Sequence, residues 1–262
     1  MKSFLLSLAV LVCLDAHLSL AQLTRPTTST GNYEVCYQWN VPKFQYPDGV
    51  TEDGLKKSGK LKERNVFISA VTAYQNRLFL TTPRYRPGVP VTLSTIPYNR
   101  EEGQNCTTNG TATTPLLQPF PSYEMNQERN CSHLIQVQAT RLDEYGRLWV
   151  ADAGRTNLLE LLPDNQCPAK LVVFDLNNGD QIVHTYEFPS SVVPRTLNII
   201  KDLQVACRSE DDCSVIVADI LRSLLVIYDL KTNQSWTKEH PSMVAQLAYA
   251  GFVINCEKKQ LI

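Results

Sequence analysis

Short apolar runs separated by polar turns recur along the chain, and two stretches repeat the same pair of runs. The runs are Arg147–Asp152 and Lys170–Leu176 in the first copy, and Val215–Asp219 and Leu224–Leu230 in the second. Asp152 and Asp219, which end the first run of each copy, lie 67 residues apart. Strands that recur while the loops between them vary in length predict a protein built from repeated β-sheets.

Further runs of β-branched and aromatic residues, bounded by Asn, Pro and Gly, predict more strands. They are Val66–Tyr74, Arg77–Thr81, Val91–Ile96, Leu134–Arg141, Ile182–Phe188 and Leu197–Val205. No connection carries the amphipathic helix that a parallel sheet requires, so each unit is expected to hold three or four antiparallel strands. Such sheets arranged radially form a β-propeller. The rival fold is a β-sandwich, whose turns come every ~8–12 residues without a long-range repeat.

A period near 67 residues divides the chain after its leader into between three and four units, whereas propellers close with roughly four to eight blades. The residues therefore predict an all-β fold, a β-propeller of about three blades plus the start of a fourth, which is incomplete. The end at Gln260–Ile262 follows the strand-like segment Ala248–Asn255 and is interpreted as a cut through that blade. An open arc exposes two sheet edges and apolar blade faces, which favours self-association.

The first residues have the organisation of a secretory signal peptide. Lys2 precedes an apolar run, Phe4–Cys13, and small residues lead to Ala21. A membrane anchor is the alternative, but the run is shorter than the roughly 20 residues that span a bilayer. We expect a signal peptide at 1–21, an N-terminal extended segment at 22–65 and a partial propeller at 66–262, in a secreted, extracellular protein.

Secretion allows cysteines to pair, and removing Cys13 with the leader leaves seven of the eight cysteines. An odd number cannot all pair within one chain. Spacing favours Cys207–Cys213 across an acidic turn and Cys106–Cys131 across a polar loop, the latter closure adding on the order of 3 kcal/mol. The pairing of three others stays open: Cys36, Cys167 and Cys256. Neither the cysteines nor the histidines have metal-ligand spacing, so we expect no metal and no cofactor.

Four sequons predict N-glycosylation, and three of them cluster in one Thr-rich stretch. They are Asn105, Asn109, Asn130 and Asn233. The formal net charge is −1 with both signs dispersed, which provides no long-range field for nucleic acid or an acidic membrane. The basic stretch from Lys56 to Arg64 is interpreted as a solvated loop.

Three residues are candidates for ligand binding. Asp152 and Asp219 recur at equivalent strand ends, where they could face a shared channel as ligand or cation groups. Each could instead cap the following turn by accepting backbone amides, as Asp commonly does. Arg84 could clamp an anionic group or stack on an aromatic ring, or it could brace its own loop through backbone carbonyls. Trp149 and Trp236 are expected in the core.

Several segments resemble the yellow and major royal jelly protein family, and they occur in the family's order. The matching segments are Arg77–Pro97, Pro115–Asn126, Arg141–Gly154, Cys167–Leu176, Ala218–Asp219 and Ser235–Trp236. The resemblance implies a secreted six-bladed propeller, of which this chain holds about the first half. One departure is Tyr145, where members usually carry a cysteine, so the resemblance implies that Cys167 lacks its customary partner.

The resemblance implies a small aromatic or biogenic-amine ligand, bound at one end of the propeller's central tunnel with contacts from the later blades. Motifs of the common hydrolases, dinucleotide enzymes and zinc proteases are missing from the sequence, and no catalytic group is identified. A non-catalytic binding protein is therefore the first hypothesis. The alternatives are a dopachrome-converting enzyme of the melanin pathway and a nutritive or structural extracellular protein without a site.

Overall fold

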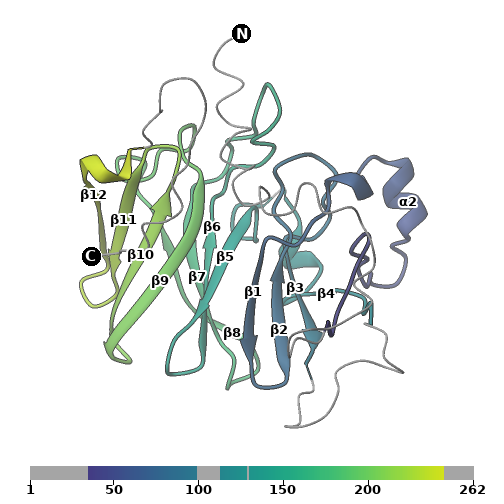
Figure 1. Cartoon of the computed structure of the whole chain (residues 1–262), viewed down its shortest axis with the longest axis horizontal. Coiled ribbons are helices and arrows are strands. Elements are labelled where there is room, and N and C mark those ends of the chain that lie inside the picture. Colours follow the sequence, from purple (N-terminus) through teal and green to yellow (C-terminus); the bar gives the residue numbers. More distant parts are fainter. Residues whose placement is uncertain (1–34, 99–112, 129, 245–262) are drawn as a thin grey trace, which may run out of the picture. The chain divides into compact units, whose positions relative to one another are not determined.

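The computed structural model describes residues 35–98, 113–128 and 130–244, and its strands form three four-stranded antiparallel sheets (Figure 1). The first contains β1 (Ala70–Tyr74), β2 (Arg77–Thr81), β3 (Leu93–Pro97) and β4 (Gln118–Pro119). The second contains β5 (Val137–Leu142), β6 (Arg147–Asp152), β7 (Lys170–Asp175) and β8 (Gln181–Glu187). The third contains β9 (Ile200–Ser209), β10 (Asp212–Asp219), β11 (Leu224–Asp229) and β12 (Gln234–Glu239).

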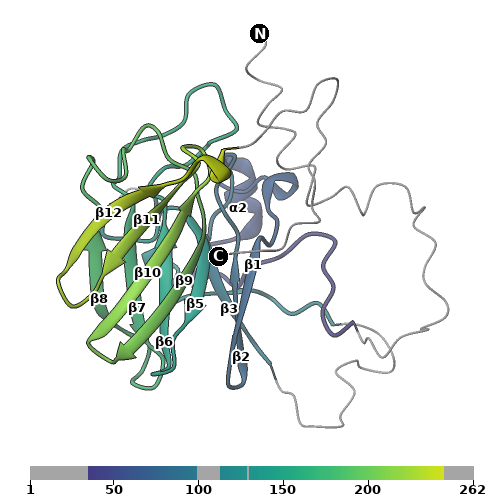
Figure 2. The same ribbon diagram turned by 60° about the vertical axis from the view of Figure 1, so that its left-hand side comes forward.

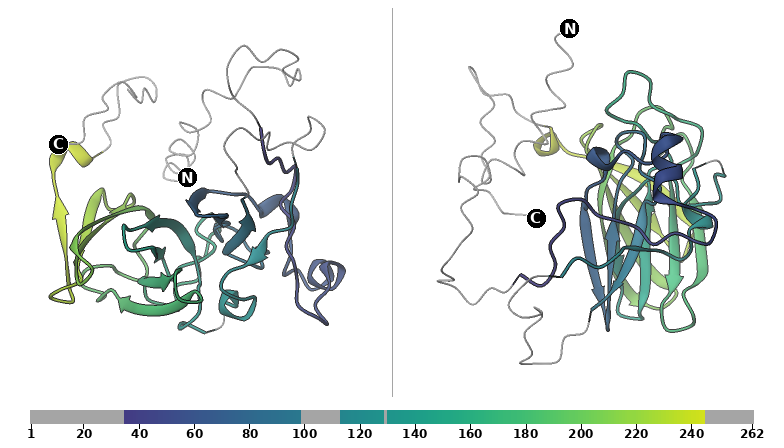
Figure 3. Two further views of the ribbon diagram at one scale, coloured as in Figure 1. Left: turned by 90° about the horizontal axis from the view of Figure 1, so that it is seen from below. Right: turned by 90° about the vertical axis from the view of Figure 1, so that its right-hand side faces the viewer.

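Consecutive sheets pack side by side, with β1, β5 and β9 as neighbouring inner strands (Figures 1 and 2). Thr72 of β1 bonds Thr140 of β5, and Arg141 of β5 donates to the carbonyl of Leu203 in β9, 2.9 Å away. The view from below shows the sheets following one another around this inner row (Figure 3). The arrangement is propeller-like, and the described strands form no closed ring. The prediction of an all-β fold with about three blades of three or four antiparallel strands is confirmed. The predicted start of a fourth blade, Ala248–Asn255, lies outside the described residues.

The two central strands of the second sheet, β6 and β7, are buried on both faces, and neighbouring residues of a strand point to opposite sides. Leu148 and Val150 of β6 pack toward the first sheet with Phe79. Trp149 points the other way and packs with Val215 of the third sheet. The continuous apolar run in β6 thus reflects a strand that lies between two neighbouring blades.

The N-terminal segment covers the free face of the first sheet. Phe44, Leu55 and Leu61 pack with Leu80 and Ile96 in one cluster. The sequence predicted two open blade faces, but among the described residues this one is covered. The sequence did not reveal this cover because the apolar residues that form it are scattered singly through loops and give no periodic signal.

A short helix, α2 (Glu52–Lys57), forms in the stretch that was expected to be a loop. Thr51 caps its N-terminus by accepting the Gly54 amide, and acidic residues begin the helix while basic residues end it. Both features stabilise short helices. The described residues also form single turns of 3-10 helix: η1 (Glu63–Asn65), η2 (Glu124–Asn126) and η3 (Pro241–Met243).

The outer face of the third sheet exposes apolar side chains. The ladder aligns Ile216 with Ile227 and Ile227 with Trp236, and Ile216 is 41% and Trp236 46% exposed. The expectation that Trp236 lies in the core is therefore wrong, whereas Trp149 is fully buried. Trp236 lies on the outermost strand, on the face that no described sheet covers.

The disulfides confirm one predicted pair and correct the other. Cys207–Cys213 is present and joins β9 to β10. Cys131 bonds Cys167, across 36 residues, and not Cys106 as predicted. Cys36 is also disulfide-bonded. Cys167, whose customary partner is replaced by Tyr145, therefore pairs with Cys131, because the chain entering β7 lies beside the segment that leads into β5.

Candidate functional site

The two repeated aspartates make equivalent contacts inside the fold. Asp152 is buried and accepts the amides of Ile135 and Gln136, at 2.8 Å each, just before β5. Asp219 accepts the amide of Ile199, at 3.0 Å, just before β9. Each also accepts the amide of the residue two positions later in the chain. Asp152 pairs with Lys170 at 3.2 Å, and Asp219 pairs with Arg222 at 2.8 Å.

Arg84 is buried and uses its guanidinium to hold loops together. It donates to the carbonyls of Val89, Pro90, Asn126, Leu134 and Ile135. Glu128 lies 3.2 Å from its Nε. These bonds occupy the five donors of a guanidinium. The ligand-binding role predicted for Arg84, Asp152 and Asp219 stays untested, and the bracing and turn roles account for the bonds that the structure gives them.

A pair of aromatic rings that the sequence did not indicate lies where the inner strands begin. Phe67 precedes β1, and Tyr85 follows β2. Their rings stack with centroids 5.8 Å apart and planes 16° from parallel. Phe67 is 41% exposed and Tyr85 is buried. Burial raises the pKa of Tyr85 to about 12, so its hydroxyl remains a proton donor at neutral pH.

Two buried glutamines lie beside this aromatic pair, Gln138 in β5 and Gln136 just before it. The Tyr85 hydroxyl donates to Oε1 of Gln138 at 2.5 Å, and Oε1 of Gln136 accepts the Arg84 amide. The Nε2 groups of both glutamines are buried without a hydrogen-bond partner. Because buried donors are nearly always paired, these two amides call for an acceptor from water or a ligand.

The third sheet contributes a lysine to the same end of the inner strands. Nζ of Lys201, the second residue of β9, lies 3.4 Å from Oγ of Ser69, the residue before β1. Burial lowers the pKa of Lys201, and Asp202 opposes the shift only in part. We call Phe67, Ser69, Tyr85, Gln138 and Lys201 the inner-strand site. Its members lie in or beside three sheets, and single residues so far apart in the sequence carry no motif.

One group of potential metal ligands can be set aside. Asp143 lies near Cys207 and Cys213, but the two sulfurs are joined in a disulfide and a metal binds thiolates. Asp143 instead accepts from Arg147 at 2.7 Å and from the indole of Trp149 at 2.8 Å. The disulfide therefore stabilises the β9–β10 hairpin, and Asp143 stabilises the turn between β5 and β6.

Two of the four predicted glycosylation sites fall on described residues, and both are exposed. Asn130 accepts the amide and the hydroxyl of Ser132, within its own sequon. Asn233 lies in the turn between β11 and β12 and accepts the Tyr228 hydroxyl at 2.9 Å. Asn105 and Asn109 lie outside the described residues. Glycosylation stays a prediction at all four.

Comparison with known proteins matches this propeller-like chain to one family. The family model described as "Major royal jelly protein" matches residues 135–261. Dopaminechrome tautomerase of Drosophila melanogaster is 33% identical over 215 residues, which cover 79% of this chain and 43% of that protein. Protein yellow of the same species is 31% identical over 222 residues, covering 83% of this chain and 38% of that protein.

The chain belongs to the yellow and major royal jelly protein family. It spans about two fifths of the length of these two relatives. A solved structure from Bacteroides ovatus covers 76% of this chain and 48% of its own, with a TM-score of 0.30 and 11% identity, values too low to carry an argument. Within the described ranges, no helix is both long and apolar enough to cross a membrane.

Proposed function

We propose that this chain acts outside the cell as a ligand-binding protein of the yellow family, and that the inner-strand site receives a small planar aromatic molecule. The observation that carries the proposal is the stacked pair of Phe67 and Tyr85 beside the unpartnered amide of Gln138. An exposed ring provides a stacking surface, and a buried amide donor suits an oxygen substituent on the ligand.

Secretion is part of this proposal. The order of charge, apolar run and small residues at the start of the chain supports it. So do the disulfides within the described residues, because such bonds persist in oxidising compartments.

The test is titration calorimetry of the purified chain with dopamine and serotonin, two aromatic amines with ring hydroxyls. We expect Phe67→Ala to weaken binding by about threefold to tenfold, the range that a lost aromatic contact corresponds to. Trp236→Ala is the matched control, since this ring is similarly exposed but lies on the far strand of the third sheet. Equal affinities of the two variants would contradict this location for the site. If neither amine binds the native chain, the ligand-binding proposal is contradicted and a nutritive or structural role is favoured.

A second candidate function is tautomerase activity. It is favoured by Lys201, whose lowered pKa increases the neutral fraction that can accept a proton, and by the name of the 33% identical relative. Dopaminechrome conversion followed by absorbance tests it. Lys201→Met should abolish turnover, and Lys201→Arg, which keeps the charge without a usable base, should do the same. Turnover that survives both substitutions would exclude Lys201 as the base.

A further inference from the structure

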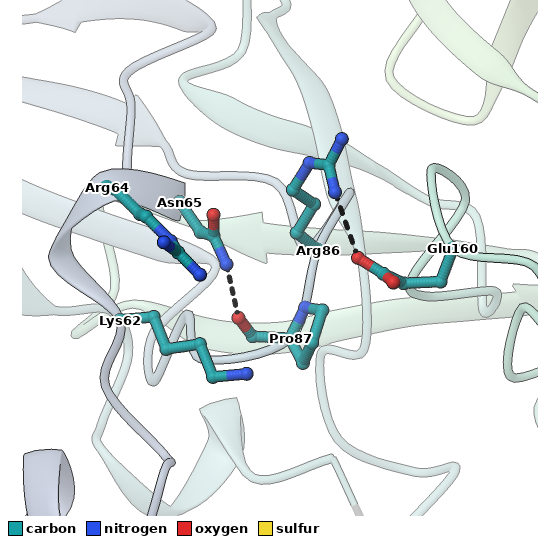
Figure 4. Close-up of a pocket in the computed structure, with 6 residues that line it drawn as sticks. All are labelled: Lys62, Arg64, Asn65, Arg86, Pro87 and Glu160. Carbon is teal, nitrogen blue, oxygen red and sulfur yellow. Dashed lines mark hydrogen bonds and ion pairs between the residues drawn. The ribbon is translucent and has the colours of Figure 1, made fainter.

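A cavity of about 480 Å³ lies between η1, the loop from β2 to β3 and the loop from β6 to β7 (Figure 4). It is lined by Lys62, Arg64, Asn65, Arg86, Pro87 and Glu160. Its volume falls in the range of roughly 300–1,000 Å³ that is usual for small-molecule sites. Its lining is polar and cationic, unlike the aromatic inner-strand site.

The cavity has an excess of positive charge that the described residues do not neutralise. Lys62 and Arg64 are exposed, and among the described residues neither side chain makes an ion pair or hydrogen bond. Lys56, in the same basic stretch, shows the contrast, because Glu52 and Glu63 lie 2.6 and 2.8 Å from its Nζ. The carboxylates of this stretch are therefore directed away from the cavity.

The backbone around the cavity is held in place before any ligand arrives. The Lys62 amide donates to the Gly88 carbonyl at 2.9 Å, and Nδ2 of Asn65 donates to the Pro87 carbonyl at 2.8 Å. Gly88 has a φ of +89°, and a Cβ there would lie 2.6 Å from Cγ of Lys62. Only glycine therefore allows the lysine stem to lie against this loop, which fixes where its ammonium group can reach.

The third cation is held by a contact that a ligand can replace. Arg86 lies 3.1 Å from Glu160, and both side chains are nearly half exposed. Exposed pairs of this kind contribute little to stability, because water screens both charges. An anion that also contacts Lys62 and Arg64 can therefore displace the carboxylate of Glu160 from Arg86.

We propose that this cavity binds a small molecule carrying at least two negative charges on phosphate or sulfate ester groups. Three cations facing one carboxylate leave two positive charges to be matched. A tetrahedral oxyanion presents oxygens in several directions, which suits Lys62 and Arg64 from the η1 segment together with Arg86 from the loop between β2 and β3. The site is independent of the proposed function, because it shares no residue with the inner-strand site.

The experiment is titration calorimetry of the full chain with four probes: inorganic phosphate, glucose 6-phosphate, a disulfated heparin disaccharide and glucose. The two ester probes distinguish a phosphorylated from a sulfated ligand. We expect one or both to bind and glucose not to bind. The affinity should fall as sodium chloride is raised, because the contacts are ionic.

Three variants locate the site. Lys62→Gln with Arg64→Gln should weaken binding by about tenfold or more, as expected for lost hydrogen bonds to charged groups. Lys57→Gln with Lys60→Gln removes the same charge from the same stretch outside the cavity, and should change the affinity by less than about twofold. Glu160→Gln should tighten binding, because Arg86 loses its competing carboxylate; a misfolded variant cannot produce this gain.

The proposal is overturned if neither ester binds the native chain. It is equally overturned if the two double variants lose the same affinity, since binding would then follow total charge and not the cavity. Weaker binding by Glu160→Gln would also contradict it.

Discussion

At the scale of single residues, Asp152 is a buried carboxylate on which several contacts depend. Its carboxylate accepts three backbone amides and lies 3.2 Å from the buried Nζ of Lys170. Lys170 in turn donates to the carbonyls of Cys131 and His133. One buried ion pair thus connects β6, β7 and the segment that enters β5.

Asp152→Ala should lower the free energy of unfolding by about 3–5 kcal/mol, because it leaves a buried cation without its counterion. Urea denaturation measures the loss. Asp229→Ala is the control: among the described residues this carboxylate accepts only from Thr232, at a turn, so its loss should cost clearly less stability than the loss of Asp152. Adding Lys170→Met to Asp152→Ala should recover part of the stability, since the orphaned charge is removed. Equal losses for Asp152→Ala and Asp229→Ala would contradict this account.

At the scale of elements, the disulfides close loops of different length. Cys207–Cys213 spans 6 residues and Cys131–Cys167 spans 36. If the bonds act by restricting the unfolded chain, replacing both cysteines by alanine should cost about 2 kcal/mol for the short loop and about 4 kcal/mol for the long one. Urea denaturation of the two double variants checks the order. A larger loss for Cys207–Cys213 would show that its packing against Arg147 matters more than loop entropy.

A histidine and a tyrosine join the second and third sheets. Nε2 of His184 in β8 lies 2.6 Å from the hydroxyl of Tyr228 in β11. That hydroxyl donates its proton to Asn233, so the neutral histidine donates to the tyrosine oxygen. Burial lowers the pKa of His184, and the positive charge of Arg147 lowers it further.

A histidine whose pKa is lower in the folded state contributes stability that is complete above the unfolded value of about 6.5. That stability is lost as the pH falls toward the folded value, because the unfolded chain binds the proton more readily. The native chain should therefore lose more stability between pH 7.5 and pH 5 than His184→Gln, whose amide still donates but does not titrate. Urea denaturation at the two pH values gives both differences, and identical pH dependence would contradict the assignment.

The strands were predictable from the sequence because their signal is local. β6 was predicted with its observed bounds, and β2 likewise, since each is an apolar run between turn residues. The pairing of Cys131 with Cys167 was not predictable, because spacing does not show which loops a fold brings together. Phe67 and Tyr85 were missed for the same reason: each is a single aromatic residue in a loop, and only the packing of the first sheet stacks them.

At the scale of the whole molecule, the three sheets expose one apolar face. The N-terminal segment covers the outer side of the first sheet, whereas Ile216 and Trp236 remain exposed on the third. The original expectation of self-association through two open faces would allow chains to add without limit. With one such face on the described part of the chain, we expect association to stop at two copies, since an interface between identical patches closes on itself.

We therefore expect a dimer that dissociates on dilution, measured by sedimentation velocity across a range of protein concentrations. Ile216→Lys with Trp236→Lys should give a monomer at all concentrations, because charges on a buried face cost several kcal/mol of desolvation. Its unfolding should be little changed, since both side chains are exposed in the monomer. Leu161→Lys with Leu162→Lys is the control, because these loop residues are 82% and 87% exposed but lie on another element. Two outcomes would show that the third sheet is not the contact face: a native chain that is monomeric at all concentrations, or a dimer that is lost in the Leu161/Leu162 variant but kept in the Ile216/Trp236 variant.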